Sequence, residues 1–148
     1  MFRGATSLNL DAKGRLAVPS KHREALFAEA AGRLVLTAHP HRCLLLYPLP
    51  AWEPIQSRIM SLSSFDPQSS KMQRLLVGYA EDVELDSAGR LLVSSVLREF
   101  AGLDKQVMLV GQGSHFEVWS MDSWRQQLER VMAGDEMSLP AELEGFSL

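Results

Sequence analysis

The chain has 148 residues, a net charge of −3 and a single cysteine, Cys43. One cysteine excludes an internal disulfide and fits a reducing compartment. The sequence has no run of about 18 apolar residues, which a membrane span would need. Its first residues also lack the apolar segment of a signal peptide, so we expect a protein of the cytoplasm.

The sequence contains an internal duplication. Residues 8–24 align without gaps with residues 83–99, and nine of the 17 aligned pairs are identical. A repeat of this length indicates a whole supersecondary unit. A unit of about 45 residues would be marginally stable alone, so we expect both copies to share one core. We divide the chain into a first repeat (5–52), a helical linker (53–80), a second repeat (81–124), and a C-terminal helix with a loose tail (125–148).

Each repeat opens with two short segments in which apolar and polar residues alternate. The alternating apolar positions are Leu8, Leu10, Leu16 and Val18 in the first repeat and Val83, Leu85, Leu91 and Val93 in the second. This period of two predicts a pair of half-buried strands. Between the strands, Asp11 and Asp86 suit the start of a tight turn, because a carboxylate can accept from the backbone amides ahead of it. Gly14 and Gly89 suit the position that needs a positive φ.

A helix is expected after the second strand of each repeat. In the first repeat, Pro19 and Ser20 favour a helix start, and Gly32 favours its end. In the second repeat the helix runs from Ser95 to Gly102. Ser94 takes the place of Pro19, so we expect the second helix to begin differently.

Two more strands and a second helix complete each repeat. The strands are expected at residues 34–38, 43–47, 107–110 and 116–119. Stripes of apolar residues that begin at Trp52 and Trp124 predict amphipathic helices, whose apolar faces we assign to the core or to an interface. Asp66 and Pro67 predict the start of the linker helix.

Charge is unevenly distributed between the repeats. Residues 1–25 carry five Lys or Arg against two acids, a net charge of +3, whereas residues 78–100 carry two Arg against five acids, a net charge of −3. A basic surface is typical of proteins that contact polyanions. The first repeat therefore has the electrostatic character of a nucleic-acid-binding surface, and the second does not.

Arg15 is the principal candidate for contact with nucleic acid. It lies in a turn, where its guanidinium group can match phosphate oxygens or a guanine edge. Lys13, Arg3 and Lys21 are the accompanying phosphate-binding candidates. The alternative for Arg15 is an ion pair with Asp11 that only closes the turn. We prefer this structural role for Arg90, because acids surround it.

Catalysis and metal binding are not expected. His39, His41 and Cys43 alternate along the chain, but no fourth ligand lies nearby in sequence, as zinc would require. Asp11 and Asp86 could form an acidic pair across a pseudo-twofold axis. However, neither lies in the Asp-Thr/Ser-Gly turn of aspartic proteases. We therefore predict neither an enzyme nor a cofactor.

Several segments closely resemble the MraZ proteins of bacteria. They are the opening Met1-Phe2-Arg3-Gly4-Ala5, the run Asn9-Leu10-Asp11-x-Lys13-Gly14-Arg15-Leu16-x-Val18-Pro19, Leu44-Leu45-Leu46-Tyr47-Pro48, and Asp86-x-x-Gly89-Arg90. The resemblance covers nearly the whole chain. It implies an α+β, mostly β fold, in which two tandem swapped-hairpin repeats of the SpoVT/AbrB type form one pseudo-dimeric barrel with flanking helices.

The same resemblance implies a function. It indicates a sequence-specific DNA-binding regulator of transcription, a ring-shaped homo-oligomer on the nucleoid that binds double-stranded DNA. Its sites would be short direct repeats upstream of the division and cell-wall gene cluster. Two alternatives remain open: a ring-forming scaffold without DNA binding, and a minimal hydrolase built on Asp11 and Asp86.

Overall fold

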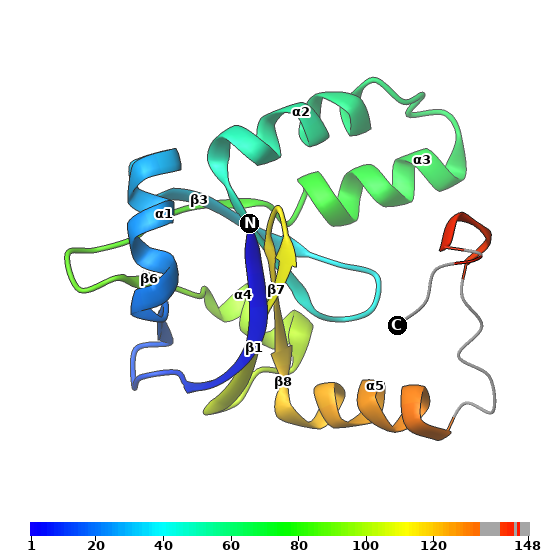
Figure 1. Ribbon diagram of the computed structural model, residues 1–148. Helices are drawn as coiled ribbons and strands as arrows, with labels where there is room; N and C mark the ends of the chain where they lie inside the picture. Colours follow the sequence, from blue (N-terminus) through cyan, green and yellow to red (C-terminus); the bar gives the residue numbers. More distant parts are fainter. Residues whose placement is uncertain (134–139, 144, 146–148) are drawn as a thin grey trace.

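The computed structural model describes residues 1–133, 140–143 and 145 (Figure 1). The strands are β1 (Phe2–Asn9), β2 (Arg15–Ala17), β3 (Arg33–Ala38), β4 (Leu44–Pro48), β5 (Glu81–Glu84), β6 (Arg90–Leu92), β7 (Gln106–Gly113) and β8 (Phe116–Ser120). The helices are α1 (Ser20–Ala30), α2 (Leu49–Met60), α3 (Pro67–Met72), the π-helix η1 (Gln73–Val77), α4 (Ser95–Ala101), α5 (Met121–Ala133) and the short η2 (Ala141–Leu143). The predicted tail lies largely outside the described residues.

The strands form one six-stranded sheet and one two-stranded ribbon. The sheet has the order β1-β7-β8-β4-β3-β5, and β2 pairs with β6 in the ribbon. All the pairings are antiparallel. Over the described residues, β1 and β5 are the two edges of the sheet and do not pair with each other. The α+β, mostly β class is therefore observed, but the sheet is not closed into the predicted barrel.

The first strand of each repeat pairs with a strand of the other repeat. Leu8 of β1 lies opposite Val107 of β7, and Val83 of β5 lies opposite Leu34 of β3. The alternation had suggested that β1 and β2 pair with each other. Instead, the strands diverge after one backbone hydrogen bond, from Asp11 N to the Arg15 carbonyl. The repeats are intertwined, so neither contains its own complete sheet.

The strand registers place a pseudo-twofold axis through the molecule. Leu16 lies opposite Leu91, which is its counterpart in the repeat. On the other side of the core, Leu45 lies opposite Glu117 at the centre of the β4–β8 pairing. A twofold axis that passes between two directly opposed residues exchanges them. Each pair of opposed counterparts, one from each repeat, therefore marks a point through which the axis passes. The two repeats are thus arranged as a pseudo-dimer within one chain.

One face of the sheet carries the main hydrophobic core. This core contains matching residues from both repeats, including Leu10 and Leu85, Leu16 and Leu91, Val18 and Val93, Leu36 and Leu109, and Leu46 and Val118. The ribbon, α1 and α4 cover it on this face. Since successive strand residues point to opposite faces, Leu34 and Leu36 enter this core while Val35 points away.

The opposite face of the sheet carries two smaller clusters. Trp52 of α2 packs against Val35, Leu45 and Tyr47, together with residues of η1. Trp119 packs with Cys43 and Val110, and Trp124 of α5 contacts this cluster. In Figure 1 the α2–α3 hairpin and α5 lie on one side of the molecule, and α1 lies on the other. Within the described residues, no helix is long and apolar enough to cross a membrane.

The observed helix ends agree in part with those predicted from the sequence. Asp66 caps α3 as predicted, because its carboxylate accepts from Ser69 N at 2.9 Å. Ser94 caps α4, whereas Pro19 occupies the cap of α1 without a side-chain hydrogen bond. The two helices therefore begin differently, as expected. The cap of α1 is Pro19, however, and Ser20 is its first helical residue.

Candidate DNA-binding face

The first turn, residues 11–15, is organised by the Asp11 carboxylate. Its Oδ1 accepts from the backbone amides of Lys13 and Arg15, each at 2.9 Å. Gly14 has a φ of +82°, as the turn chemistry requires. The Arg15 amide that donates to the carboxylate holds the pKa of Asp11 below its usual value. Asp11 is thus ionised at neutral pH and committed to the turn.

The second turn, residues 86–90, repeats this geometry. Asp86 Oδ1 accepts from the amides of Ala88 and Arg90, each at 2.9 Å. Gly89 has a φ of +75°. The Arg90 amide likewise lowers the pKa of Asp86. Each aspartate is thus bound within its own turn, whereas the hydrolase alternative assumed one acidic pair formed by both.

Each turn also contains an ion pair. Arg15 Nε lies 2.6 Å from Asp11 Oδ2, and Arg90 Nε lies 3.0 Å from Asp86 Oδ2. Both arginine side chains remain partly exposed, at 30% for Arg15 and 39% for Arg90. Such pairs add little stability, but they fix the direction of the guanidinium group. Within the described residues, neither arginine forms a hydrogen bond through its terminal nitrogens, so these donors remain available.

The ribbon brings the two arginines to one face. Leu16 and Leu91 point into the core, so the flanking residues of β2 and β6 point outward. Arg15 lies directly opposite Leu92, and Ala17 lies directly opposite Arg90. Directly opposed residues project to the same side of an antiparallel pair. We call Arg15, Ala17, Arg90 and Leu92 the outer ribbon face.

Two further arginines cover the turn glycines across the repeat boundary. A Cβ on Gly14 would lie 2.8 Å from Cζ of Arg98, which belongs to α4 of the second repeat. A Cβ on Gly89 would lie 2.3 Å from Nε of Arg23 in α1, and this Nε donates to the Val18 carbonyl at 2.6 Å. Arg23 and Arg98 were not predicted as turn residues. Their identity in the aligned repeats was the available signal.

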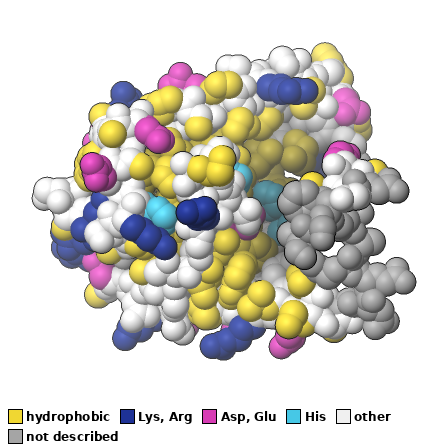
Figure 2. Space-filling view, viewed as in Figure 1, with side chains coloured by type: hydrophobic (Ala, Val, Ile, Leu, Met, Phe, Trp, Pro, Cys, Tyr) yellow, Lys and Arg dark blue, Asp and Glu magenta, His cyan; other side chains and the backbone are white. Residues whose placement is uncertain are grey.

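The other predicted cations, Lys13, Arg3 and Lys21, are all exposed. Lys13 is exposed in the first turn, while Arg3 and Lys21 are exposed on β1 and α1. Lys21 Nζ would be 3.2 Å from a Cβ on Gly4, which places it beside the strand segment that carries Arg3. The four cations thus form two pairs, Lys13 with Arg15 and Arg3 with Lys21. Lys and Arg side chains gather at the left of Figure 2, on the side where α1 and β6 lie in Figure 1.

His39 and His41 lie against each other in the turn between β3 and β4, and Cys43 follows them. His39 Nδ1 accepts from the His41 amide, and the two rings lie 4.7 Å apart. Cys43 is fully buried, and burial raises the pKa of its thiol to about 12. Within the described residues, no three His, Cys, Asp or Glu side chains are grouped to hold a metal ion.

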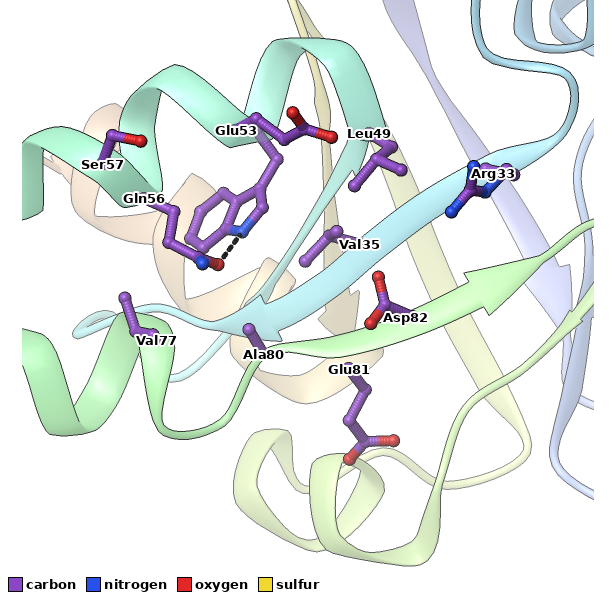
Figure 3. Close-up of a pocket in the computed structure, with 11 residues that line it drawn as sticks. Arg33, Val35, Leu49, Glu53, Gln56, Ser57, Val77, Ala80, Glu81 and Asp82 are labelled. Carbon is purple, nitrogen blue, oxygen red and sulfur yellow. Dashed lines mark hydrogen bonds between the residues drawn. The ribbon is translucent and has the colours of Figure 1, made fainter. Parts of the chain in front are cut away.

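A hollow of about 510 Å³ lies between α2, β3 and β5 (Figure 3). Trp52 Nε1 donates to Gln56 Oε1 at 2.8 Å inside it, and Arg33 and Asp82 lie at its rim. Glu81 points away from the hollow in Figure 3 and accepts from Ser94 Oγ at 2.7 Å. The polar groups that line the hollow do not converge on a common point, so the outer ribbon face is the stronger candidate site.

Comparison with known proteins identifies the family. The model of the family described as "MraZ protein, putative antitoxin-like" matches residues 1–75 and again residues 76–144. The transcriptional regulator MraZ of Methylobacillus flagellatus is 79% identical over 148 residues, which is the full length of both chains. The protein of the same name from Nitrosomonas eutropha is 54% identical over the full length of both chains. That from Dechloromonas aromatica is 60% identical over 138 residues, 91% of this chain and 93% of its own. With two matched repeats and relatives of this similarity, the chain belongs to the MraZ family.

Proposed function

We propose that this protein is a sequence-specific DNA-binding regulator of transcription that acts as a ring-shaped homo-oligomer. The observation that carries the proposal is the outer ribbon face. There, Arg15 and Arg90 project to the same side, each held at Nε by an aspartate. Their terminal nitrogens are the groups that bind phosphate or a guanine edge in pairs.

The cations divide into a reading group and positioning groups. Arg15 reads a base edge, since its ion pair with Asp11 fixes the guanidinium direction. Lys13, Arg3 and Lys21 bind phosphates and set the register of the protein on the duplex. Arg90 mainly closes its own turn. Its surroundings are acidic, and Ala88 stands where the first turn has Lys13.

Oligomerisation would compensate for the net charge of −3 of one chain. A ring that presents several first turns on one surface could engage several short direct repeats of DNA together. Tethered contacts of this kind gain affinity through effective concentration. The exposed apolar residues of the α2–α3 hairpin and of α5, such as Phe65 and Met132, are available for contacts between copies. Following the family resemblance, the DNA target would be repeats upstream of the division and cell-wall genes, on the nucleoid.

An electrophoretic shift series tests this proposal. Wild-type protein is titrated onto duplexes that carry one or several copies of the candidate repeat, at increasing salt. The affinity should rise with the number of repeats. It should also fall steeply with salt, because each neutralised phosphate releases about one counterion.

The same series separates DNA binding from the scaffold alternative. Arg15→Ala is the matched variant, since Arg15 is partly exposed and lies outside the core that contains Leu16. A scaffold would show equal, weak retention for wild type and Arg15→Ala at every salt concentration. That result, with an intact ring by light scattering, would contradict the proposal.

A further inference from the structure

We propose that Leu92 is a specificity-determining residue that contacts the 5-methyl group of a thymine beside the base read by Arg15. This inference rests on the proposed DNA-binding function and assigns a base-reading role to the second repeat. It starts from the register of the ribbon, in which Leu92 is the residue directly opposite Arg15.

Leu92 is unusually exposed for a leucine in a strand. Its exposed fraction is 53%, whereas its neighbours Leu91 and Val93 are almost completely buried. Directly opposed residues of an antiparallel pair have Cβ atoms about 5 Å apart on the same side. Leu92 therefore stands beside Arg15 on the outer ribbon face, where an apolar side chain contributes nothing to the core.

The pseudo-twofold axis shows how the two halves of this region differ. The aligned positions pair Lys13 with Ala88, Ala17 with Leu92, and Lys21 with Val96. The first repeat supplies cations at two of these positions, and the second supplies only apolar residues. Val96 is also exposed, at 55%, in the first turn of α4. Because the strands are antiparallel, Leu92 of the second repeat lies beside Arg15, whereas only Ala17 of the first repeat lies beside Arg90. The two ends of the outer ribbon face therefore differ in apolar content.

Thymine provides the matching chemistry. In the major groove, its C5-methyl group is the apolar feature of an A·T pair, and apolar side chains contact it. Arginine pairs with the O6 and N7 atoms of guanine in the same groove. Arg15 and Leu92, side by side, are therefore suited to a guanine and a thymine on neighbouring base pairs.

The surrounding charges favour DNA over a neighbouring copy of the chain. Leu92 lies opposite Arg15, and Arg90 lies on the same face two residues before it. A protein surface that covered Leu92 would desolvate both guanidinium groups, which is costly without matching acids. DNA supplies an apolar methyl group and anionic phosphates together.

The test removes single methyl groups from the DNA. A binding site is first selected from random duplexes by the wild-type protein, and each thymine in it is then replaced in turn by deoxyuridine. Dissociation constants are measured for wild type, Leu92→Ala and the conservative variant Leu92→Met. One replacement should weaken wild-type binding about fourfold, as expected for the burial of one methyl group.

The variants complete a double-mutant cycle between protein and base. Leu92→Ala should bind the thymine site more weakly than wild type and should be insensitive to the critical deoxyuridine. Leu92→Met should retain the sensitivity. Additive losses, insensitivity of the wild type, or a selected site without thymine would overturn the inference.

Two controls separate the possible failures. If Leu92→Ala forms smaller oligomers by light scattering, this face is an interface between copies, and the thymine role is wrong. If the wild type binds its site, Arg15→Ala does not, and no deoxyuridine has an effect, only the role of Leu92 fails. If the wild type selects no sequence, the proposed function fails as well.

Discussion

Arg23 of the first repeat covers Gly89 of the second, so closely that a Cβ on Gly89 would lie 2.3 Å from Arg23 Nε. The same nitrogen donates to the Val18 carbonyl, and Val18 N donates to the Gly89 carbonyl at 2.9 Å. The second turn is therefore fastened to the start of α1. Each turn depends on the other repeat for its support.

Gly14→Val and Gly89→Val should each destabilise the protein strongly. A β-branched residue at positive φ costs at least about 1–2 kcal/mol, and the covering arginine must also move. Because the main core draws on both repeats, each variant should melt in a single transition at a lower temperature. Calorimetry provides the measurement. Two transitions, with only one of them shifted, would mean that the repeats fold independently.

Arg15→Ala and Arg90→Ala should have unequal effects on DNA binding. Loss of a base-reading arginine costs about 1–3 kcal/mol, so Arg15→Ala should reduce affinity about 5- to 150-fold. Arg90→Ala should weaken binding much less. Both side chains are partly exposed, so both variants should remain folded by circular dichroism. Equal losses would show that both turns read DNA.

Asp11→Ala should weaken DNA binding through the position of Arg15. The carboxylate holds the Lys13 and Arg15 amides and the Arg15 side chain. Its removal should cost about 1 kcal/mol of stability and should lower the affinity for the selected site. Asp86→Ala is the matched control, since it removes the same bonds from the second turn. A comparable loss of affinity in both variants would argue against a special role for the first turn.

The free energy of unfolding should fall as the pH is lowered from 7 to 5. His22 is buried between Phe2 and Phe116, with ring centroids at 5.8 and 5.0 Å. Burial lowers the pKa of His22 below its ordinary value of 6.5, and the Lys21 charge lowers it further. Below pH 6.5 the unfolded state therefore binds more protons than the folded state, which destabilises the fold.

Urea titrations at several pH values would measure this dependence. His22→Gln should make it shallower without abolishing it, because burial also lowers the pKa values of His39 and His115. The exposed His41 supplies the control variant His41→Gln. If His22→Gln changes the pH dependence no more than His41→Gln does, then His22 is not the main source of that dependence.

Local sequence chemistry was sufficient for the turns and most helix ends. Asp11 and Gly14 adopt the predicted turn because carboxylate–amide bonds and a positive φ involve only neighbouring residues. The cap at Asp66 was predictable for the same reason. Local patterns of this kind predict where a strand lies, but they carry no information about its partner.

Strand pairing therefore required the structure. The alternation around Leu8 and Leu16 suggested a local pair, but β1 pairs with β7 and β2 pairs with β6. The predicted barrel is not closed, because β1 and β5 end as separate edges in the part of the chain that the structure describes. The position of Leu92 opposite Arg15 depends on the same long-range register. For that reason the sequence pattern alone did not select it.

The pseudo-twofold arrangement also gives the proposed DNA-binding surface a direction. Two identical chains around an exact twofold axis must present identical halves, and such a surface matches a palindrome. Fusion of the repeats into one chain removes that requirement. The buried pair Leu16 and Leu91 has stayed alike, while Ala17 and Leu92 beside it have diverged. A surface with unlike ends distinguishes the two orientations of a duplex, which suits head-to-tail repeats in the DNA better than inverted ones.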